Sequence, residues 1–557
     1  MPLNLKSLLR KISYGKNFGV WQNLSMKRIC DRKILWGLAI FACGLVGFSA
    51  CDEEKEESVE KERVQKSENV TENGAESESG LEIELSDADS KFLQITGKMA
   101  GQLADGNFAS MYIRMNESYR TIYSQEEFAA MGQNFLDAES SGGESSGEKI
   151  KVDFSQDQGG FYTYCQAAFP NGKYVTVAFN PDSDYPVMII FKKYVDSGAE
   201  TLREICEDNF KIGCGMTGYS AGNSAMNHEE YTELAAFHFS SATSTNLMKP
   251  SSILVQSKSI ENAKNGDGSP VLDFSNVDPI LSWAQENDVN VRGHTLVWHT
   301  QAPDWFFKEG YKSDGELVDR ETMISRADSF IGQYLTYCQE NYPGVVYCWD
   351  VVNEAVDPAG GDSESFFKCR TKNGDEKNLW YYTIGSDYPE VAFKIARKYA
   401  ADGVKLFYND YSTTDATKRN YIYKLCEDLK SKGLIDGIGM QSYWDLKNPT
   451  LLNIRRTLEK YGELGLELQL TEWSIPVNKE TEEEFNLQAE RYGSIFRLLK
   501  KLDTSTGGPL NITCVSSFGL VDHYPYYSND TNNTRWWDCD YEPKASFYAI
   551  ADSLGFE

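Results

Sequence analysis

Two glutamates are candidates for acid and base chemistry: Glu354 in WDVVNEAVD (349–357) and Glu472 in LELQLTEWSIPV (466–477). Each follows a run of residues typical of a buried strand. Cleavage of a bond between two sugars needs one carboxyl group that protonates the leaving oxygen and a second that attacks or stabilises the sugar carbon. The chain between the two glutamates is long enough for about three strand–helix units, which suits two carboxyl groups that meet at one mouth of a barrel.

The region from 203 to 555 alternates short apolar runs with helical stretches. This alternation predicts an α/β domain, a (β/α)₈ TIM barrel, in which side chains at the strand ends form the active face. Polar and aromatic clusters do fall at the ends of the runs. The runs lie at about 211–215, 241–245, 289–297, 346–353, 404–408, 437–441, 466–471 and 513–519.

The segment after the third run, GHTLVWHTQAPDWF (293–306), contains two histidines, two tryptophans and a glutamine. An apolar floor with directional donors suits a sugar, because its rings stack on aromatic faces and its hydroxyls need hydrogen bonds. After the fourth run, Asn353 stands next to Glu354 and could hold a substrate hydroxyl. We expect like-charge repulsion from Glu472 to raise the pKa of Glu354 and keep it protonated. The alternative is an Asn-Glu pair that caps a helix.

Residues 86–198 predict a small α+β domain in front of the barrel. Phe92, Ile95, Met99 and Leu103 recur at helical spacing, and Ser124-x-x-Glu127 is typical of a capping box. Strand-like runs at 150–154, 161–169, 173–179 and 187–191 predict an antiparallel meander. This order of helices and strands resembles the cone-shaped domains of the nuclear-transport-factor-2-like superfamily. A spacer, a dimerisation unit and a binding accessory are the alternatives for its role.

The first 51 residues are typical of an export leader, because basic residues at 27, 28, 32 and 33 precede an apolar run over 34–48. The run ends in Phe48-Ser49-Ala50-Cys51, which resembles the lipobox of bacterial lipoproteins and predicts lipidation at Cys51. We therefore expect an exported lipoprotein anchored to the membrane at the bacterial cell surface. An ordinary secretory signal, which would give a secreted protein, and a single membrane anchor are the alternatives. Residues 52–85 are charged and poor in large apolar side chains, which predicts an acidic disordered linker.

The composition excludes several classes of function. A net charge of −28 argues against a nucleic-acid partner, because phosphate backbones are bound by clustered Lys and Arg. Nine cysteines follow the leader without a C-x-x-C pair, and the five histidines include no H-E-x-x-H spacing, so we expect no zinc site. Nine is an odd number, so at least one thiol stays free or pairs between chains.

Seven motifs together resemble family 10 of the glycoside hydrolases, the endo-β-1,4-xylanases, over about 205–552. They occur in the order found in that family. They are ATSTNLMKPSSIL (242–254), GHTLVWHTQAPDWF (293–306), WDVVNEAVD (349–357), LWYYTIGSDYPEVAF (379–393), KLFYNDYS (405–412), IDGIGMQSYW (435–444) and LQLTEWSIPV (468–477).

The resemblance implies a TIM barrel in which Glu354 is the general acid/base and Glu472 the nucleophile of a reaction that retains anomeric configuration. It implies that Asn353 holds the 2-hydroxyl of the attacked sugar, that Gln441 lies near the nucleophile and that Tyr411 contacts sugar beyond the cleaved bond. The residues implied to line the sites on the non-reducing side are Asn246, Lys249, His294, Trp298 and Gln301.

Several residues depart from the pattern of that family. Thr245 replaces a common Glu, Tyr443 a histidine, and Trp473-Ser474 a leucine-aspartate pair, while Phe518 takes the place of a tryptophan. A phenol at 443 can still donate to the nucleophile. These changes concern substrate preference more than reaction type.

The sequence thus predicts an endo-1,4-β-xylanase that acts on xylan and xylo-oligosaccharides without a cofactor. A β-glycanase for another backbone, such as mixed-linkage glucan, is one alternative, permitted by residues 245, 443 and 518. A surface protein that captures xylan without cutting it is the other.

Overall fold

The computed structural model describes residues 81–138, 149–155, 160–170, 172–191, 201–220, 222–522 and 533–555. The predicted leader with Cys51, and the predicted linker up to residue 80, lie outside these residues. Within them, no helix is both long and apolar enough to cross a membrane.

The small domain combines helices with one five-stranded sheet of order β1-β2-β3-β4-β5, in which β1 and β2 are parallel and the other pairs antiparallel. Its helices are α3 (Lys91–Ala104), α4 (Phe108–Arg114), α5 (Glu117–Ile122) and α6 (Gln125–Asp137). Its strands are β1 (Glu82–Leu85), β2 (Lys149–Phe154), β3 (Thr163–Ala168), β4 (Tyr174–Phe179) and β5 (Pro186–Ile190).

The predicted elements of this domain are confirmed. Of the four periodic side chains of α3, Met99 and Leu103 are buried, and Phe92 and Ile95 are half-buried against the same core. Leu93, which was not in the predicted set, is also buried. Ser124 and Glu127 form the predicted capping box at the start of α6, which satisfies backbone N–H groups in the first turn. The likeness to the nuclear-transport-factor-2-like superfamily stays a prediction.

Two details of this region were predicted wrongly or not at all. Strand β1 lies within 52–85, the range predicted to be a disordered linker, so the folded domain begins at about residue 81 and not 86. Its alternating exposure, with Ile83 and Leu85 packed on the core, shows that a short strand needs few apolar residues when it pairs at a sheet edge. Helices α4 and α5 were not predicted, because each is too short to show a clear period; Asn107 and Asn116 cap them.

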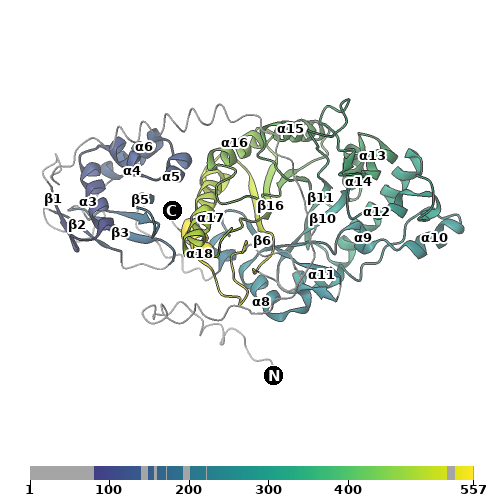
Figure 1. The fold of residues 1–557 in the computed structure, drawn as a ribbon, viewed down its shortest axis with the longest axis horizontal. Coiled ribbons are helices and arrows are strands. Elements are labelled where there is room, and N and C mark those ends of the chain that lie inside the picture. The colour runs from purple at the N-terminus through teal and green to yellow at the C-terminus, as the bar shows by residue number, and fades with distance from the viewer. Residues whose placement is uncertain are drawn as a thin grey trace, which may run out of the picture. The chain divides into compact units, whose positions relative to one another are not determined.

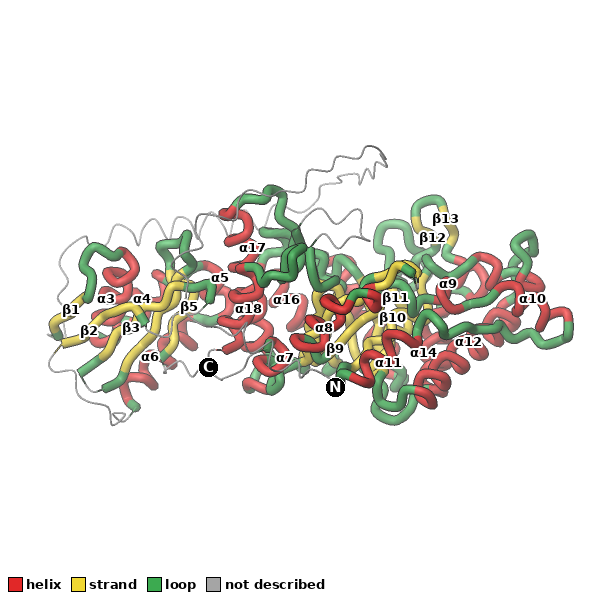
Figure 2. The backbone as a smooth tube through the Cα atoms, turned by 90° about the horizontal axis from the view of Figure 1, so that it is seen from below, coloured by secondary structure: helices red, strands yellow, loops and turns green. Residues whose placement is uncertain are grey.

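The second domain is a closed barrel of eight parallel strands, as predicted, and its strands close in the order β6-β9-β10-β11-β14-β15-β16-β17. Helices surround the strands (Figures 1 and 2). The strands are β6 (Lys211–Met216), β9 (Ser241–Ser244), β10 (Asn290–Trp298), β11 (Val346–Asn353), β14 (Lys405–Asp410), β15 (Gly437–Met440), β16 (Glu467–Trp473) and β17 (Ile512–Ser517).

The helices of this domain alternate with its strands, which is the connectivity that parallel strands require. Those that precede the fourth barrel strand are α7 (Leu202–Ile205), α8 (Glu229–His238), α9 (Pro250–Ile253), α10 (Gln256–Lys264), α11 (Asp278–Glu286) and α12 (Arg320–Asn341). Those that follow it are α13 (Leu379–Ile384), α14 (Tyr388–Tyr399), α15 (Ala416–Ser431), α16 (Leu451–Gly462), α17 (Glu482–Leu502) and α18 (Ala545–Gly555).

The nine cysteines after the leader all lie in the described part of the chain. Eight of them are buried and free, and Cys539 is exposed. The prediction was that at least one thiol stays free or pairs between chains, and the buried thiols confirm the first alternative. The buried thiols behave as small apolar groups, and burial raises the pKa of Cys165 to about 12, so this thiol stays protonated.

The barrel interior is packed closely enough that a single methyl group at Gly293 has no room. A Cβ atom there would lie 2.3 Å from the ring of Trp349, which is almost fully buried. We expect Gly293→Ala to lower the free energy of unfolding by roughly 1–3 kcal/mol, measured by chemical denaturation. Gly268→Ala is the matched control, because a Cβ there meets nothing within 4 Å. Equal stabilities of the two variants would contradict this packing.

Candidate active site

Glu354 follows the last residue of β11, and its backbone has a φ of 58°, a left-handed conformation that is uncommon for a residue with a side chain. Two hydrogen bonds hold it there. Its N–H donates to the carbonyl of Asn409 at 2.9 Å, and its own carbonyl accepts from Nε of Arg370 at 2.8 Å. The chain turns sharply at this point, so the backbone around the carboxyl group is fixed on both sides.

Glu472 lies on β16 and is buried, with 8% of the residue exposed. One carboxylate oxygen accepts from Nδ2 of Asn409 at 2.9 Å. The other accepts a short hydrogen bond from the hydroxyl of Tyr443. Donation by this phenol was predicted and is confirmed.

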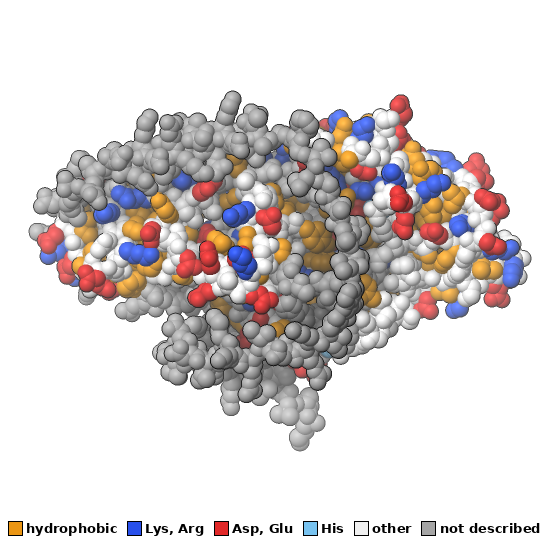
Figure 3. All heavy atoms as spheres, in the orientation of Figure 1, with side chains coloured by type: hydrophobic (Ala, Val, Ile, Leu, Met, Phe, Trp, Pro, Cys, Tyr) orange, Lys and Arg blue, Asp and Glu red, His pale blue; other side chains and the backbone are white. Residues whose placement is uncertain are grey.

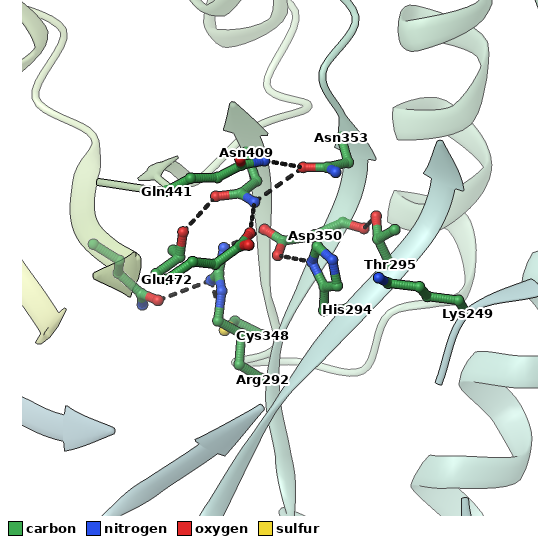
Figure 4. Close-up of polar contacts among 12 residues, drawn as sticks. Lys249, Arg292, His294, Thr295, Cys348, Asp350, Asn353, Asn409, Gln441 and Glu472 are labelled. Carbon is green, nitrogen blue, oxygen red and sulfur yellow. Dashed lines mark hydrogen bonds and ion pairs between the residues drawn. The ribbon is translucent and has the colours of Figure 1, made fainter. Parts of the chain in front are cut away.

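Three amide side chains connect the two carboxyl groups, and Figure 4 shows them at the ends of neighbouring strands. Asn409 donates both to Glu472 and, at 2.9 Å, to Oδ1 of Asn353. Gln441 donates to Oε1 of Glu354 at 2.9 Å and to Asn353 at 3.3 Å. Glu354 and Glu472 therefore belong to one hydrogen-bonded network.

The pKa of Glu354 is raised, as predicted, but the causes differ from the prediction. Burial is the largest cause, repulsion from Asp410 follows, and repulsion from Glu472 contributes least; hydrogen bonds from neighbours oppose them. The sequence analysis named only Glu472. It missed Asp410, although this residue also stands at the end of a strand.

Asp410, at the end of β14, is fully buried and held by charge and hydrogen bonds. Nζ of Lys418 lies 2.7 Å from Oδ1, and the hydroxyl of Tyr408 donates to Oδ2 at 2.5 Å. Lys418 also lies 3.3 Å from the ring centre of Tyr411. Asp410 and Lys418 thus form a buried pair of opposite charges near Glu354. The negative charge of Asp410 raises the pKa of Glu354.

His299 lies beside Glu354, with Nε2 at 3.9 Å from Oε2. Burial lowers the pKa of His299 to about 3, and the positive charges of Arg370 and Lys418 lower it further. The imidazole is therefore neutral at ordinary pH and places no cation next to the acid.

Three predicted binding residues form a hydrogen-bonded cluster. Nζ of Lys249 donates to Oε1 of Gln301 at 2.8 Å and to Oδ1 of Asn246 at 3.3 Å. The ammonium lies 4.6 Å from the ring centre of Trp298. Burial lowers the pKa of Lys249 to about 8, although Glu472 and Glu354 oppose the shift.

His294 points toward a buried ion pair inside the barrel (Figure 4). Its Nδ1 lies 2.9 Å from Oδ2 of Asp350, which also pairs with the fully buried Arg292. Arg292 donates in addition to Gln469 at 2.8 Å, and its guanidinium lies over the ring of Phe407. This polar layer fixes the orientation of the His294 ring.

The two aromatic side chains at 443 and 518 meet edge to face, with ring centres 5.4 Å apart. Phe518 also has the guanidinium of Arg535 at 5.7 Å from its ring centre. Tyr411 accepts a hydrogen bond from Arg370 at 2.8 Å. The structure thus brings Tyr443 and Phe518 together near Glu472, and places Tyr411 in the charged cluster on the side of Glu354.

This geometry agrees with comparisons to known proteins. Residues 201–553 match glycosyl hydrolase family 10. The chain belongs to this family. Two relatives are a protein of Caldicellulosiruptor saccharolyticus, provisionally named endo-1,4-β-xylanase, and endo-1,4-β-xylanase B of Butyrivibrio fibrisolvens. The first is 43% identical over 51% of this chain and 90% of its own length. The second is 37% identical over 63% of this chain and 52% of its own length.

Solved structures of the family share the fold. One is an endo-1,4-β-D-xylanase of Clostridium thermocellum, two modules of which are complexed with xylohexaose. It aligns with a TM-score of 0.57 and 29% identity, over 68% of this chain and 72% of that one. The native form of a second xylanase aligns with a TM-score of 0.51 and 32% identity, over 64% of this chain and 99% of that one.

As a member of glycosyl hydrolase family 10, the chain is a glycoside hydrolase. Such chemistry needs two carboxyl groups, and the structure joins those of Glu354 and Glu472 in one hydrogen-bonded network. In the described part of the chain, no group of three or more His, Cys, Asp and Glu is arranged to hold a metal ion.

One replacement in this family member has a clear local role. Thr245 is buried, donates to the carbonyl of Met216 at 3.4 Å and accepts from Asn246 at 3.3 Å. It therefore ties Asn246 to the neighbouring strand. A glutamate at 245 would add a longer, charged side chain to this buried position.

Sequence reasoning missed several residues that serve the site in this family 10 enzyme. Asn409 and Asp410 belong to the motif KLFYNDYS, and two polar residues at the end of a predicted buried strand were a usable signal. Arg370 and Lys418 gave no such signal, because Arg370 lies in a loop and Lys418 in the first turn of α15.

The repulsion between Asp410 and Glu354 makes a prediction about pH. If Glu354 is the general acid, as the sequence predicts, it must be protonated to act, and the alkaline limb of kcat/KM follows its pKa. Asp410→Asn removes a negative charge that raises this pKa, and we expect the alkaline limb to move to lower pH. Asp402→Asn, at an exposed position, is the control and should leave the limb unchanged. A folded Asp410→Asn variant with an unchanged limb would exclude the repulsion.

Proposed function

We propose that the protein is an endo-1,4-β-xylanase that hydrolyses internal β-1,4-xylosidic bonds of xylan with retention of anomeric configuration. The observation that carries this proposal is the single network of Asn353, Asn409 and Gln441 that joins Glu354 to Glu472. The named activity of the relatives and the xylohexaose complex of one similar structure support the choice of substrate.

In the first step the carboxyl group of Glu354 donates its proton to the glycosidic oxygen, and a carboxylate oxygen of Glu472 attacks the anomeric carbon. The bond to the leaving sugar breaks, and a covalent glycosyl-enzyme forms. Burial and the charge of Asp410 favour the protonated state of Glu354 that this step requires.

In the second step the carboxylate of Glu354 removes a proton from water, and the water oxygen attacks the anomeric carbon from the face opposite Glu472. The ester bond breaks, Glu472 leaves as a carboxylate, and two inversions give net retention. The short hydrogen bond from Tyr443 stabilises the negative charge of Glu472 before and after the two steps.

The sugar on the non-reducing side meets the cluster of Asn246, Lys249 and Gln301, with Trp298 as its aromatic neighbour. These are amide, ammonium and apolar groups, which suit a neutral ring with hydroxyls. We assign the 2-hydroxyl of the attacked sugar to Asn353, which lies between the two carboxyl groups.

A cavity of about 730 Å³ opens beside Tyr443. We assign the sugars on the other side of the bond to this cavity. Its lining mixes hydroxyl, amide, carboxylate and aromatic groups, among them Ser412, Thr414, Trp444 and Asn448. The volume is sufficient for sugar units beyond the cleaved bond. An internal cut needs such room on both sides.

The charges of the surface fit a neutral polymer. On the face shown in Figure 3, Lys and Arg side chains are scattered among Asp and Glu side chains. The net charge of the chain is −28. The excess of negative charge would repel a polyanion, but it would not repel a neutral xylan backbone.

Proton NMR of the purified protein with a linear xylo-oligosaccharide tests the activity and its stereochemistry together. We expect β-anomers to appear first and then mutarotate. Glu354→Gln and Glu472→Gln should each reduce the rate at least about a thousandfold, because each removes a reacting group. Glu467→Gln, at the other end of β16, is the matched control and should stay active.

Other outcomes of this experiment would contradict the proposal in distinct ways. Early α-anomers would mean that the roles of the two glutamates are wrong. Cleavage of mixed-linkage glucan without cleavage of xylan would mean that Thr245, Tyr443 and Phe518 redirect specificity to another backbone. Binding of xylan without any product would favour a capture protein.

We also propose that the enzyme is anchored to the bacterial cell surface through a lipid on Cys51. The basic residues, the apolar run over 34–48 and the sequence Phe48-Ser49-Ala50-Cys51 support this proposal. Tethering would keep released oligosaccharides close to the membrane for uptake.

Fractionation of cells tests the anchor. We expect the unaltered protein in the membrane fraction, with a lipid detected by mass spectrometry on its N-terminal cysteine, and Cys51→Ala outside that fraction. Cys43→Ala, within the apolar run, is the control and should remain in the membrane fraction. Recovery of the unaltered protein from the culture medium would favour an ordinary secretory signal.

A further inference from the structure

Strands β4 and β5 of the small domain are buried on both faces, whereas antiparallel strands commonly have one face in water. One face packs on helices of its own domain. The opposite face packs on Ala489 of α17 and Ala549 of α18, which are helices of the barrel domain. We call this second surface the docking face. Its residues are Phe161, Tyr162, Tyr164, Ala178, Val187, Met188 and Ile190.

A buried arginine lies at the centre of this contact. Arg497 of α17 is only 5% exposed and donates to the hydroxyl of Tyr162 at 2.8 Å and to Ser553 of α18 at 3.2 Å. It also pairs with Glu490 at 3.4 Å, which accepts in turn from Asn116 of the small domain. A buried guanidinium that lost these partners would be costly, so both domains are needed to satisfy it.

The fit at this point leaves no space. A Cβ atom at Gly493 of α17 would lie 2.5 Å from the hydroxyl oxygen of Tyr162. On α18, Oδ2 of Asp552 accepts from the backbone N–H of Phe161 at 2.8 Å. The contact is therefore matched in shape and in hydrogen bonding, as in a protein interior and not as in a loose domain boundary.

A second part of the contact involves the C-terminal end of α5. Arg455 of α16 donates to the carbonyls of Thr121 and Ile122, at 2.8 and 3.1 Å. Ile122 is fully buried and belongs to the apolar core of the barrel domain. Lys501 of α17 pairs with Glu127 at 2.8 Å. Three barrel helices in succession thus bind the small domain.

The opposite side of α17 holds the chain that follows the nucleophile. The ring of Trp473, next to Glu472, lies 4.7 Å from that of Tyr492. The hydroxyl of Tyr492 accepts from the N–H of Ile475 at 3.0 Å, and Gln488 donates to the carbonyl of Ile475 at 2.5 Å. One side of α17 therefore fixes residues 473–475, while the other side is covered by the small domain.

We propose that the small domain is a brace for α17, which keeps the segment after Glu472 in place, and not a module that binds polysaccharide. Its surface of interaction is the docking face, and its partner is the α16–α18 side of the same chain. The expected effect of the small domain on catalysis rests on the proposed role of Glu472. Its expected effect on the stability of the barrel does not rest on that role, so an experiment can reject either effect without the other.

Calorimetry and kinetics of full-chain variants test the brace. Tyr162→Phe removes only the hydroxyl that Arg497 binds, and Met188→Asp places a carboxylate in the docking face. Ile113→Asp is the matched control, because Ile113 is 40% exposed on α4 of the same domain. The measurements are the thermal transitions, and kcat and KM on a short xylo-oligosaccharide well below the melting temperature.

We expect a single transition for the unaltered chain, lowered by about 3 °C in Tyr162→Phe and further in Met188→Asp. We expect kcat of Met188→Asp to fall at least about threefold with little change in KM, because the nucleophile is displaced and the binding cluster is not. Ile113→Asp should change neither.

Two results would overturn the brace. Separate transitions, with that of the barrel unchanged in Met188→Asp, would mean that the domains are independent. An unchanged kcat on the short substrate, with weaker binding of polymeric xylan, would mean that the small domain is a binding accessory. If Met188→Asp unfolds the small domain, the proposal still requires a lower transition temperature for the barrel domain. A loss of stability in a protein that never cuts xylan would support the brace and reject the proposed activity.

Discussion

The site depends on one constraint. The carboxyl groups of Glu354 and Glu472 are largely buried at the strand ends of the barrel, and each needs hydrogen-bond donors there. Asn409 meets that need for Glu472 and is joined through Asn353 to the network of Glu354. Asn353 and Asn409 are direct partners in the register of β11 and β14, so the strand pairing itself creates the network. A buried polar group without partners is costly, and a slip of one residue would leave several such groups unsatisfied.

Charges around this network set the protonation of its members. Asp410 raises the pKa of Glu354, while Lys418 neutralises Asp410 enough for it to remain buried. Burial, together with the positive charges of Arg370 and Lys418, lowers the pKa of His299 and keeps its ring neutral beside Glu354. The pair of Arg292 and Asp350 performs a structural task deeper in the barrel, where it orients His294. The small domain acts at a greater distance, through the two sides of α17.

The barrel and the two glutamates could be predicted because their signals are local. Each strand is a short apolar run, and Glu354 and Glu472 stand at or near the ends of two of them. Most predicted binding residues also lie close together, because the strand ends of a barrel converge.

The relative size of the effects that raise the pKa of Glu354 could not be predicted. It depends on how deeply Glu354 is buried and on the position of Asp410 on the neighbouring strand. Strand β1 was missed because an edge strand needs little apolar sequence. The contact between Tyr162 and Arg497 joins residues far apart in the chain, and no spacing rule predicts it.

The central claim is that Glu472 forms the covalent bond to the sugar while Glu354 moves the proton. Mass spectrometry of the protein after incubation with a 2-deoxy-2-fluoro xylobioside that carries a good leaving group tests it most directly, because the fluorine slows hydrolysis of the intermediate. The account predicts one added 2-deoxy-2-fluoroxylobiosyl group, a disaccharide, per chain, located by peptide mapping on Glu472 and absent from Glu472→Gln. A label on Glu354, or turnover of the reagent by Glu472→Gln at the unaltered rate, would contradict it.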